Sequence, residues 1–149
     1  MTSVGNVSGY AGDINPSQAW ELLARDPKAQ LVDVRTAAEW AFVGLPDLSS
    51  VGREVHRVQW QQYPEMSVNP EFVRMVAGQL QASGASLETP VLFLCRSGGR
   101  SRAAAVAMTA SGYRSALNVT GGFEGDADAA GHRGTIGGWK AAGLPWRQS

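Results

Sequence analysis

We base the predicted fold and chemistry of this chain first on the residues Val91-Leu-Phe-Leu-Cys95-Arg-Ser-Gly-Gly-Arg100-Ser101-Arg102. This stretch begins with a short apolar run, typical of a strand buried on both faces, and leads into the alanine-rich segment 103–110, a strong helix former. The loop between them holds two glycines, three arginines and the only cysteine of the protein. Loop N–H groups and the positive end of a helix converge at such a point, so we expect an anion-binding cradle. The same field favours a thiolate, and the sequence therefore predicts a nucleophilic cysteine with an anionic substrate.

The composition indicates one domain over residues 1–149. Hydrophobic residues make up 44% of the chain, which is ordinary for a globular domain, and 13 basic residues balance 13 acidic ones. We therefore expect no binding to nucleic acid or to an anionic membrane surface. Segment 1–10 is expected to be a loose leader, since it does not have the pattern of a signal peptide. One cysteine forms no internal disulfide, which favours a reducing compartment and predicts a cytoplasmic protein.

Strand and helix signals alternate along the chain. Proline one residue after an asparagine predicts helix starts at Asn15-Pro16 and Asn69-Pro70. Further elements are expected as strands at 30–35, 54–58 and 115–119, and as helices at 36–42, 103–112 and 139–142. This alternation predicts an α/β fold with a mainly parallel sheet, in which ligands bind beyond the carboxyl ends of the strands. Cys95 and the sequence Asp33-Val-Arg35 both lie at such ends.

Three stretches in order resemble the rhodanese (sulfurtransferase) domain in its single-domain form. The first is Leu31-Val-Asp-Val-Arg35 followed by Glu39-Trp40, and the second is Cys95-Arg-Ser-Gly-Gly-Arg-Ser101. The third is Gly121-Gly122, followed by Trp139 and Ala142-Gly-Leu-Pro145. Together they cover about residues 12–146. The resemblance implies a parallel sheet of about five strands, flanked by helices on both faces, with the cysteine loop above it.

Two departures from the family pattern stand out. The family usually has G-H-I-P-G-A after the Glu-aromatic pair, whereas this chain has Val43-Gly44-Leu45-Pro46-Asp47-Leu48 and lacks the histidine. The family also places Gly-Gly and Trp about three residues apart, whereas here the segment 123–138 separates them. Because this insert follows the carboxyl end of a strand, we expect it near the rim of the active site.

The resemblance implies sulfur transfer by double displacement. The thiolate of Cys95 attacks the outer sulfur of thiosulfate or a similar donor, sulfite leaves, and an acceptor then attacks the persulfide. The absence of a second cysteine makes the acceptor external: cyanide, a small thiol or a thiol of a partner protein. The active-site loop assigned in this way holds Cys95 as the nucleophile, surrounded by Arg96, Ser97, Gly98, Gly99, Arg100 and Ser101. Arg96 is expected to meet the anionic donor, while Arg100 either lines the pocket or anchors the loop.

Charged residues outside the loop are expected to support it. Asp33 and Arg35 are predicted to form a bracing ion pair, and Glu39 is predicted to pair with Arg35 at helical spacing. With two histidines beside one cysteine, we expect no protein metal site and no cofactor.

Two other functions remain open from the sequence. Cysteine-based phosphatases and arsenate reductases use a C-x5-R loop, whereas Cys95 and Arg100 give C-x4-R, a shorter loop that suits sulfur better than phosphate. Some rhodanese-like domains serve instead as sulfur carriers or as interaction modules that dock a partner protein.

Overall fold

A five-stranded parallel sheet forms the centre of the molecule. The computed structural model describes residues 9–62 and 64–148. Every neighbouring pair of strands in this sheet is parallel, in the order β1-β8-β7-β2-β4. The strands are β1 (Gly12–Ile14), β2 (Gln30–Asp33), β4 (His56–Arg57), β7 (Val91–Leu94) and β8 (Ala116–Val119). The predicted α/β fold with a parallel sheet of about five strands is confirmed.

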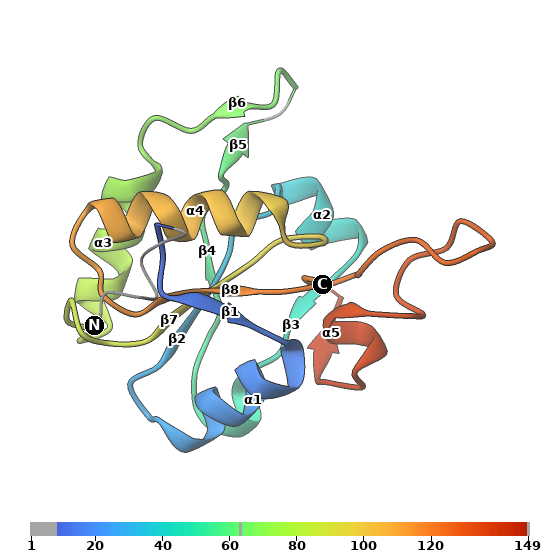
Figure 1. Ribbon diagram of the computed structural model, residues 1–149, viewed down its shortest axis with the longest axis horizontal. Coiled ribbons are helices and arrows are strands. Elements are labelled where there is room, and N and C mark those ends of the chain that lie inside the picture. The colour runs from blue at the N-terminus through green and yellow to red at the C-terminus, as the bar shows by residue number, and fades with distance from the viewer. Residues whose placement is uncertain (1–8, 63, 149) are drawn as a thin grey trace.

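Helices cover both faces of the sheet (Figure 1). On one face lie α3 (Phe72–Ala82) and α4 (Gly99–Ala110), which pack over the valines and Phe93 of the central strands. On the other face lie α1 (Pro16–Arg25) and α5 (Gly138–Ala141), which pack over the leucines of the central strands, with Trp139 of α5 buried against them. Because successive strand residues point to opposite faces, the all-buried run Val91–Leu94 supplies both cores.

Capping residues explain where two of the helices begin. Asn15 caps the start of α1, as predicted, and the structure adds a capping box between Asn15 and Gln18. Thr36 forms a second box with Glu39 at the start of α2 (Ala37–Phe42). The predicted start at Asn69-Pro70 is wrong by two residues. The Asn69 side chain accepts from the Glu71 N–H in a turn, and α3 begins only at Phe72.

Short strands were not predicted from the sequence. β3 (Leu45–Pro46) pairs antiparallel with β9 (Trp146–Arg147), and β5 (Gln61–Gln62) pairs with β6 (Ser67–Val68) in a hairpin that projects from the body (Figure 1). Two-residue strands carry too little periodicity to be recognised in a sequence. The same limit explains why the strand expected over 54–58 is reduced to β4.

The expectation of a loose leader over 1–10 is wrong at its end. Residues 1–8 lie outside the described part of the chain, whereas Tyr10 is buried in the core beneath α4 and is 4% exposed. The backbone of Ala11 already donates to the Ala116 carbonyl, next to the pairing of β1 with β8. None of the described helices combines the length and apolar character needed to cross a bilayer.

Candidate active site

Cys95 lies between the carboxyl end of β7 and the beginning of α4, and it is almost fully buried. The Gly98 N–H donates to its Sγ at 3.1 Å, and the Ser101 hydroxyl oxygen lies 3.3 Å from Sγ. Gly98 adopts a φ of 121°, which turns the chain sharply enough to bring its N–H back onto the sulfur. The sulfur therefore meets a polar donor, a hydroxyl and the positive end of a 12-residue helix.

The other loop residues differ in exposure. Arg96 and Gly99 are exposed, and Ser97 is half-buried. The backbone of the loop is held from below, since the Phe123 N–H donates to the Cys95 carbonyl at 2.8 Å. Glu124 and Gly125 both donate to the Arg96 carbonyl. The first residues of the insert thus support the loop directly.

Arg100 anchors the loop to α2. Its two terminal nitrogens donate to the two carboxylate oxygens of Glu39, at 2.8 and 3.0 Å. Such a bidentate pair fixes both position and orientation. The predicted pair between Glu39 and Arg35 is wrong. Arg35 is held by Asp33, and the Arg100 guanidinium, 61 positions away, takes the Glu39 carboxylate.

The predicted ion pair between Asp33 and Arg35 is present and completely buried. Arg35 donates through Nε and Nη2 to the Asp33 carboxylate, and Nη2 also donates to the Gly44 carbonyl at 2.7 Å. Its guanidinium lies 4.3 Å from the centre of the Phe123 ring. One side chain therefore links β2, the loop after α2 and the start of the insert.

Gly44 occupies the position of the family histidine, and the structure gives a reason for the change. Its φ is 108°, and an added Cβ would lie 2.8 Å from the Arg147 carbonyl oxygen and 2.9 Å from the Trp146 ring. The pairing of β3 with β9 thus fills the space that a side chain would need.

The carboxyl of Glu39 titrates far below its ordinary range. Burial alone would raise its pKa, but the hydrogen bonds from Arg100 and from the Thr36 backbone outweigh burial and lower the pKa from 4.5 to about 2. A carboxylate with a lowered pKa stabilises the fold above its unfolded value, and this contribution is lost as the pH falls from about 4.5 towards about 2.

Replacing Glu39 with glutamine is therefore expected to flatten the acid limb of the stability curve. Because the carboxyl is only half-buried, we expect the variant to lose about 1–2 kcal/mol at neutral pH and little more between pH 4.5 and pH 2. Urea unfolding at several pH values measures the effect. Glu21→Gln, in an exposed pair with Arg25, is the matched control and should change little. An acid limb as steep as that of the wild type would contradict the assignment.

Gly122 lies directly under the Cys95 loop. Its φ is 61°, and an added Cβ would press on the Cys95 carbonyl oxygen and lie 2.6 Å from the Arg96 carbonyl carbon. These atoms belong to the backbone, which cannot move aside as the end of a flexible side chain can. Only glycine therefore fits where the insert begins.

Gly122→Ala is expected to destabilise the protein by about 2–4 kcal/mol, from steric overlap together with backbone strain. Gly131→Ala is the matched control, since Gly131 has a similar φ of 82° with nothing within 4 Å, and it should cost about 1 kcal/mol. Thermal unfolding measures both variants. Equal losses of stability in Gly122→Ala and Gly131→Ala would contradict the prediction, because the overlap with the loop would then add nothing to the backbone strain.

The rest of the insert extends away from the sheet (Figure 1). Asp128 closes a turn by accepting from the Ala130 and His132 N–H groups and from the Thr135 hydroxyl. These hydrogen bonds lower the pKa of Asp128. Asp126 and His132 are exposed. Among the described residues no cluster of histidine, cysteine and carboxylate side chains is arranged to hold a metal ion.

The sequence reasoning missed a polar chain behind Cys95. The Ser101 hydroxyl lies 2.6 Å from Oδ1 of the buried Asn118, and Asn118 donates to Asp13 at 3.0 Å. Tyr10 donates to the same Asp13 oxygen at 2.8 Å. A signal was present, since an asparagine in the middle of a buried strand is costly unless it is hydrogen-bonded.

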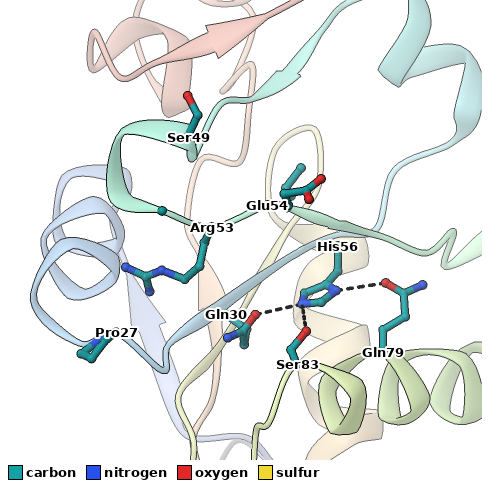
Figure 2. A pocket seen from close by; sticks show the side chains of 10 residues that line it. Pro27, Gln30, Ser49, Arg53, Glu54, His56, Gln79 and Ser83 are labelled. Atoms are coloured by element: carbon teal, nitrogen blue, oxygen red, sulfur yellow. Dashed lines mark hydrogen bonds between the residues drawn. The ribbon is translucent and has the colours of Figure 1, made fainter.

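A separate groove of about 700 Å³ lies at the edge strand β4, near the start of β2. Figure 2 shows His56 there, with Nδ1 hydrogen-bonded to Gln79 and Nε2 hydrogen-bonded to Gln30. Arg53 donates to the carbonyls of Asp26 and Ala29, in the turn between α1 and β2. These side chains tie β2, β4 and α3 together, and the groove does not include any residue of the cysteine loop.

Comparisons with known proteins agree with this arrangement. The family model described as the STR4 middle domain matches residues 12–149. The crystal structure of Rv0390 from M. tuberculosis is similar with a TM-score of 0.84 and 52% identity, covering 94% of this chain and 99% of that one. An uncharacterized protein of Rickettsia conorii is 34% identical over 135 residues, 91% of this chain and 96% of its own. A protein named thiosulfate sulfurtransferase GlpE, from Actinobacillus succinogenes, is 26% identical over 133 residues, 89% of this chain and 87% of its own. The chain thus belongs to the rhodanese-like family, in the group described as the STR4 middle domain.

Proposed function

We propose that the protein is a sulfurtransferase that moves sulfane sulfur from thiosulfate or a similar small donor through a persulfide on Cys95. The observation that carries the proposal is the environment of Sγ, where the Gly98 N–H donates to the sulfur at the beginning of the 12-residue helix α4. Groups of this kind stabilise negative charge on sulfur. Membership of the rhodanese-like family supports the same chemistry.

The reaction consists of two displacements on sulfur. The Cys95 thiolate forms a bond to the sulfane sulfur of thiosulfate, and the bond between the two thiosulfate sulfurs breaks with its electron pair leaving on sulfite. An acceptor, either cyanide or a thiolate, then bonds to the same sulfane sulfur, and Cys95 leaves as the thiolate. The exchange with cyanide needs no external oxidant or reductant and turns thiosulfate and cyanide into sulfite and thiocyanate.

The position of Arg100 supports sulfur over phosphate as the group transferred. A phosphatase loop needs its arginine free to bind the oxygens of a tetrahedral anion. Here both terminal nitrogens of Arg100 are committed to the Glu39 carboxylate. Among residues 95–101, Arg96 is the exposed cation, and we assign it to the anionic end of the donor.

The burial of Cys95 favours a small donor and a slender acceptor. Cys95 is 1% exposed, so the sulfane sulfur of the donor must pass the residues of the active-site loop to reach Sγ. We propose cyanide, a small thiol or a thiol on an extended segment of a partner protein as the acceptor. A single nucleophilic cysteine requires a reducing environment, and we place the reaction in the cytoplasm.

Steady-state assays with two sulfur donors and one phosphatase substrate test the proposal. We expect thiocyanate formation from thiosulfate and cyanide, slower turnover of mercaptopyruvate, and hydrolysis of p-nitrophenyl phosphate at background rates. Faster mercaptopyruvate turnover would change the donor but keep the reaction class. Hydrolysis of p-nitrophenyl phosphate faster than thiocyanate formation would overturn the proposal.

A further inference from the structure

A row of hydrogen bonds connects Cys95, which follows the central strand β7, with the edge strand β1. It runs from Cys95 to Ser101 on α4, to Asn118 on β8 and to Asp13 on the edge strand β1. Asp13 and Asn118 are direct neighbours in the parallel register, so their side chains share the face covered by α4. The row combines residues that are far apart in sequence and includes two that have no part in the proposed displacement.

The Ser101 hydroxyl has one proton and two neighbours that compete for it. Its oxygen lies 2.6 Å from Asn118 Oδ1 and 3.3 Å from Cys95 Sγ. A hydroxyl donates one hydrogen bond and accepts others, so the proton belongs to the shorter contact. In this arrangement the lone pairs of Ser101, and not its proton, face the sulfur.

Asp13 fixes the direction of this row. An ionised carboxylate only accepts, so Asn118 must present its amide NH₂ to Asp13 and its carbonyl oxygen to Ser101. Tyr10 donates to the same carboxylate. Burial raises the pKa of Tyr10, and the hydrogen bond to Asp13 raises it further, which keeps the phenol protonated as a donor.

We propose that Asp13 and Asn118 are positioning residues that turn the Ser101 hydroxyl away from Cys95 and so hold the resting cysteine as a thiol. In this state the S–H group donates to Ser101. When the Cys95 thiol ionises, its proton leaves to solvent. The Ser101 hydroxyl then turns to donate to the sulfur, and its hydrogen bond to Asn118 is broken. The inference rests on the proposed function only for the role of this row, which is to keep the nucleophile protonated between turnovers.

Other charged groups lie near the sulfur without being members of this row. Arg100 on α4 interacts electrostatically with both Cys95 and Asp33. Glu39 on α2 pairs with Arg100, and Arg35 neutralises Asp33 on β2. Arg102 on α4 is exposed and contacts Tyr10. The hydrogen bonds of Arg100, Glu39 and Arg35 do not involve Asp13 or Asn118, whereas Arg102 is linked to Asp13 through Tyr10. A double-mutant design therefore separates the effect of these charges from the effect of the Ser101 hydroxyl.

The test measures the ultraviolet absorbance of the thiolate as the pH is raised, with Cys95→Ser as the blank. In Asp13→Ala, Asn118 is free to turn over and Ser101 to donate to sulfur, so we expect about fivefold more thiolate at a pH below the wild-type midpoint. Asn118→Ala should reach the same state by removing the acceptor of the Ser101 proton. In a Ser101→Ala background, Asp13→Ala should change the thiolate fraction by less than about twofold, which is the effect of its charge alone.

Each outcome decides the proposal. An equal effect of Asp13→Ala with and without the Ser101 hydroxyl would show that Asp13 acts through its charge, and the proposal would fail. The proposal would also fail if Asp13→Ala or Asn118→Ala left the thiolate fraction of Cys95 unchanged. Glu21→Ala, on the exposed face of α1, is the control for loss of a distant carboxylate. The titration uses neither donor nor acceptor, so a chain that shows the coupling but transfers no sulfur would refute the proposed function alone.

Discussion

Replacing Cys95 with serine is expected to lower thiocyanate formation from thiosulfate by at least about a thousandfold. The serine hydroxyl remains protonated at neutral pH and is a poor nucleophile towards sulfur, so the covalent intermediate is lost. The substitution changes one buried atom, and a serine hydroxyl can also accept from the Gly98 N–H and make the contact with Ser101. The variant should therefore fold, and circular dichroism together with steady-state kinetics checks both statements.

Ser101→Ala is the matched control within the same loop. It removes one contact to the sulfur but leaves the nucleophile and the Gly98 N–H, so about a tenfold loss is expected. A Cys95→Ser protein that kept a tenth of the wild-type rate would exclude a Cys95 persulfide from the reaction.

Arg35→Ala is expected to destabilise the protein by about 3–5 kcal/mol, the largest stability effect that we predict. The substitution leaves the Asp33 carboxylate buried without its partner, removes a donor to the Gly44 carbonyl and opens a cavity against Phe123. The loss is a large part of the whole stability of a domain of this size. Urea unfolding at neutral pH measures it.

Two variants separate the cost of the unpaired charge from the cost of lost packing. Arg74→Ala breaks an exposed pair with Glu71 and should cost less than about 1 kcal/mol. The double variant Asp33→Asn with Arg35→Met removes both charges and should be more stable than Arg35→Ala. A double variant less stable than Arg35→Ala would mean that the ion pair itself, and not the penalty for leaving Asp33 unpaired, holds the two segments together.

The fold was predictable from the sequence because its main signals are local. The apolar run before Cys95, the glycines after it and the alanine-rich helix are contiguous, and the cap at Asn15 lies within three residues of its partner Gln18. Segments of two or three residues gave no such signal. The edge strand β1 therefore went unrecognised, although it pairs with β8 over its full length.

The contacts of the site were less predictable because they depend on distance in space. Glu39 and Arg35 have a favourable spacing in sequence, but Arg35 is drawn into the buried pair with Asp33, and folding brings Arg100 to Glu39 instead. Gly122 could be recognised as part of a turn, but not as the residue that touches the backbone of Cys95. A pairing between strands, such as that of Asp13 with Asn118, exists only once the order of strands in the sheet is known.

Intact mass spectrometry after mixing with thiosulfate detects a persulfide on Cys95 directly. We expect the wild-type protein to gain the mass of one sulfur atom and cyanide to remove it with formation of thiocyanate, whereas Cys95→Ser should gain nothing. An unchanged mass in wild-type protein that turns over thiosulfate, or an added sulfur that persists in Cys95→Ser, would contradict a persulfide on Cys95.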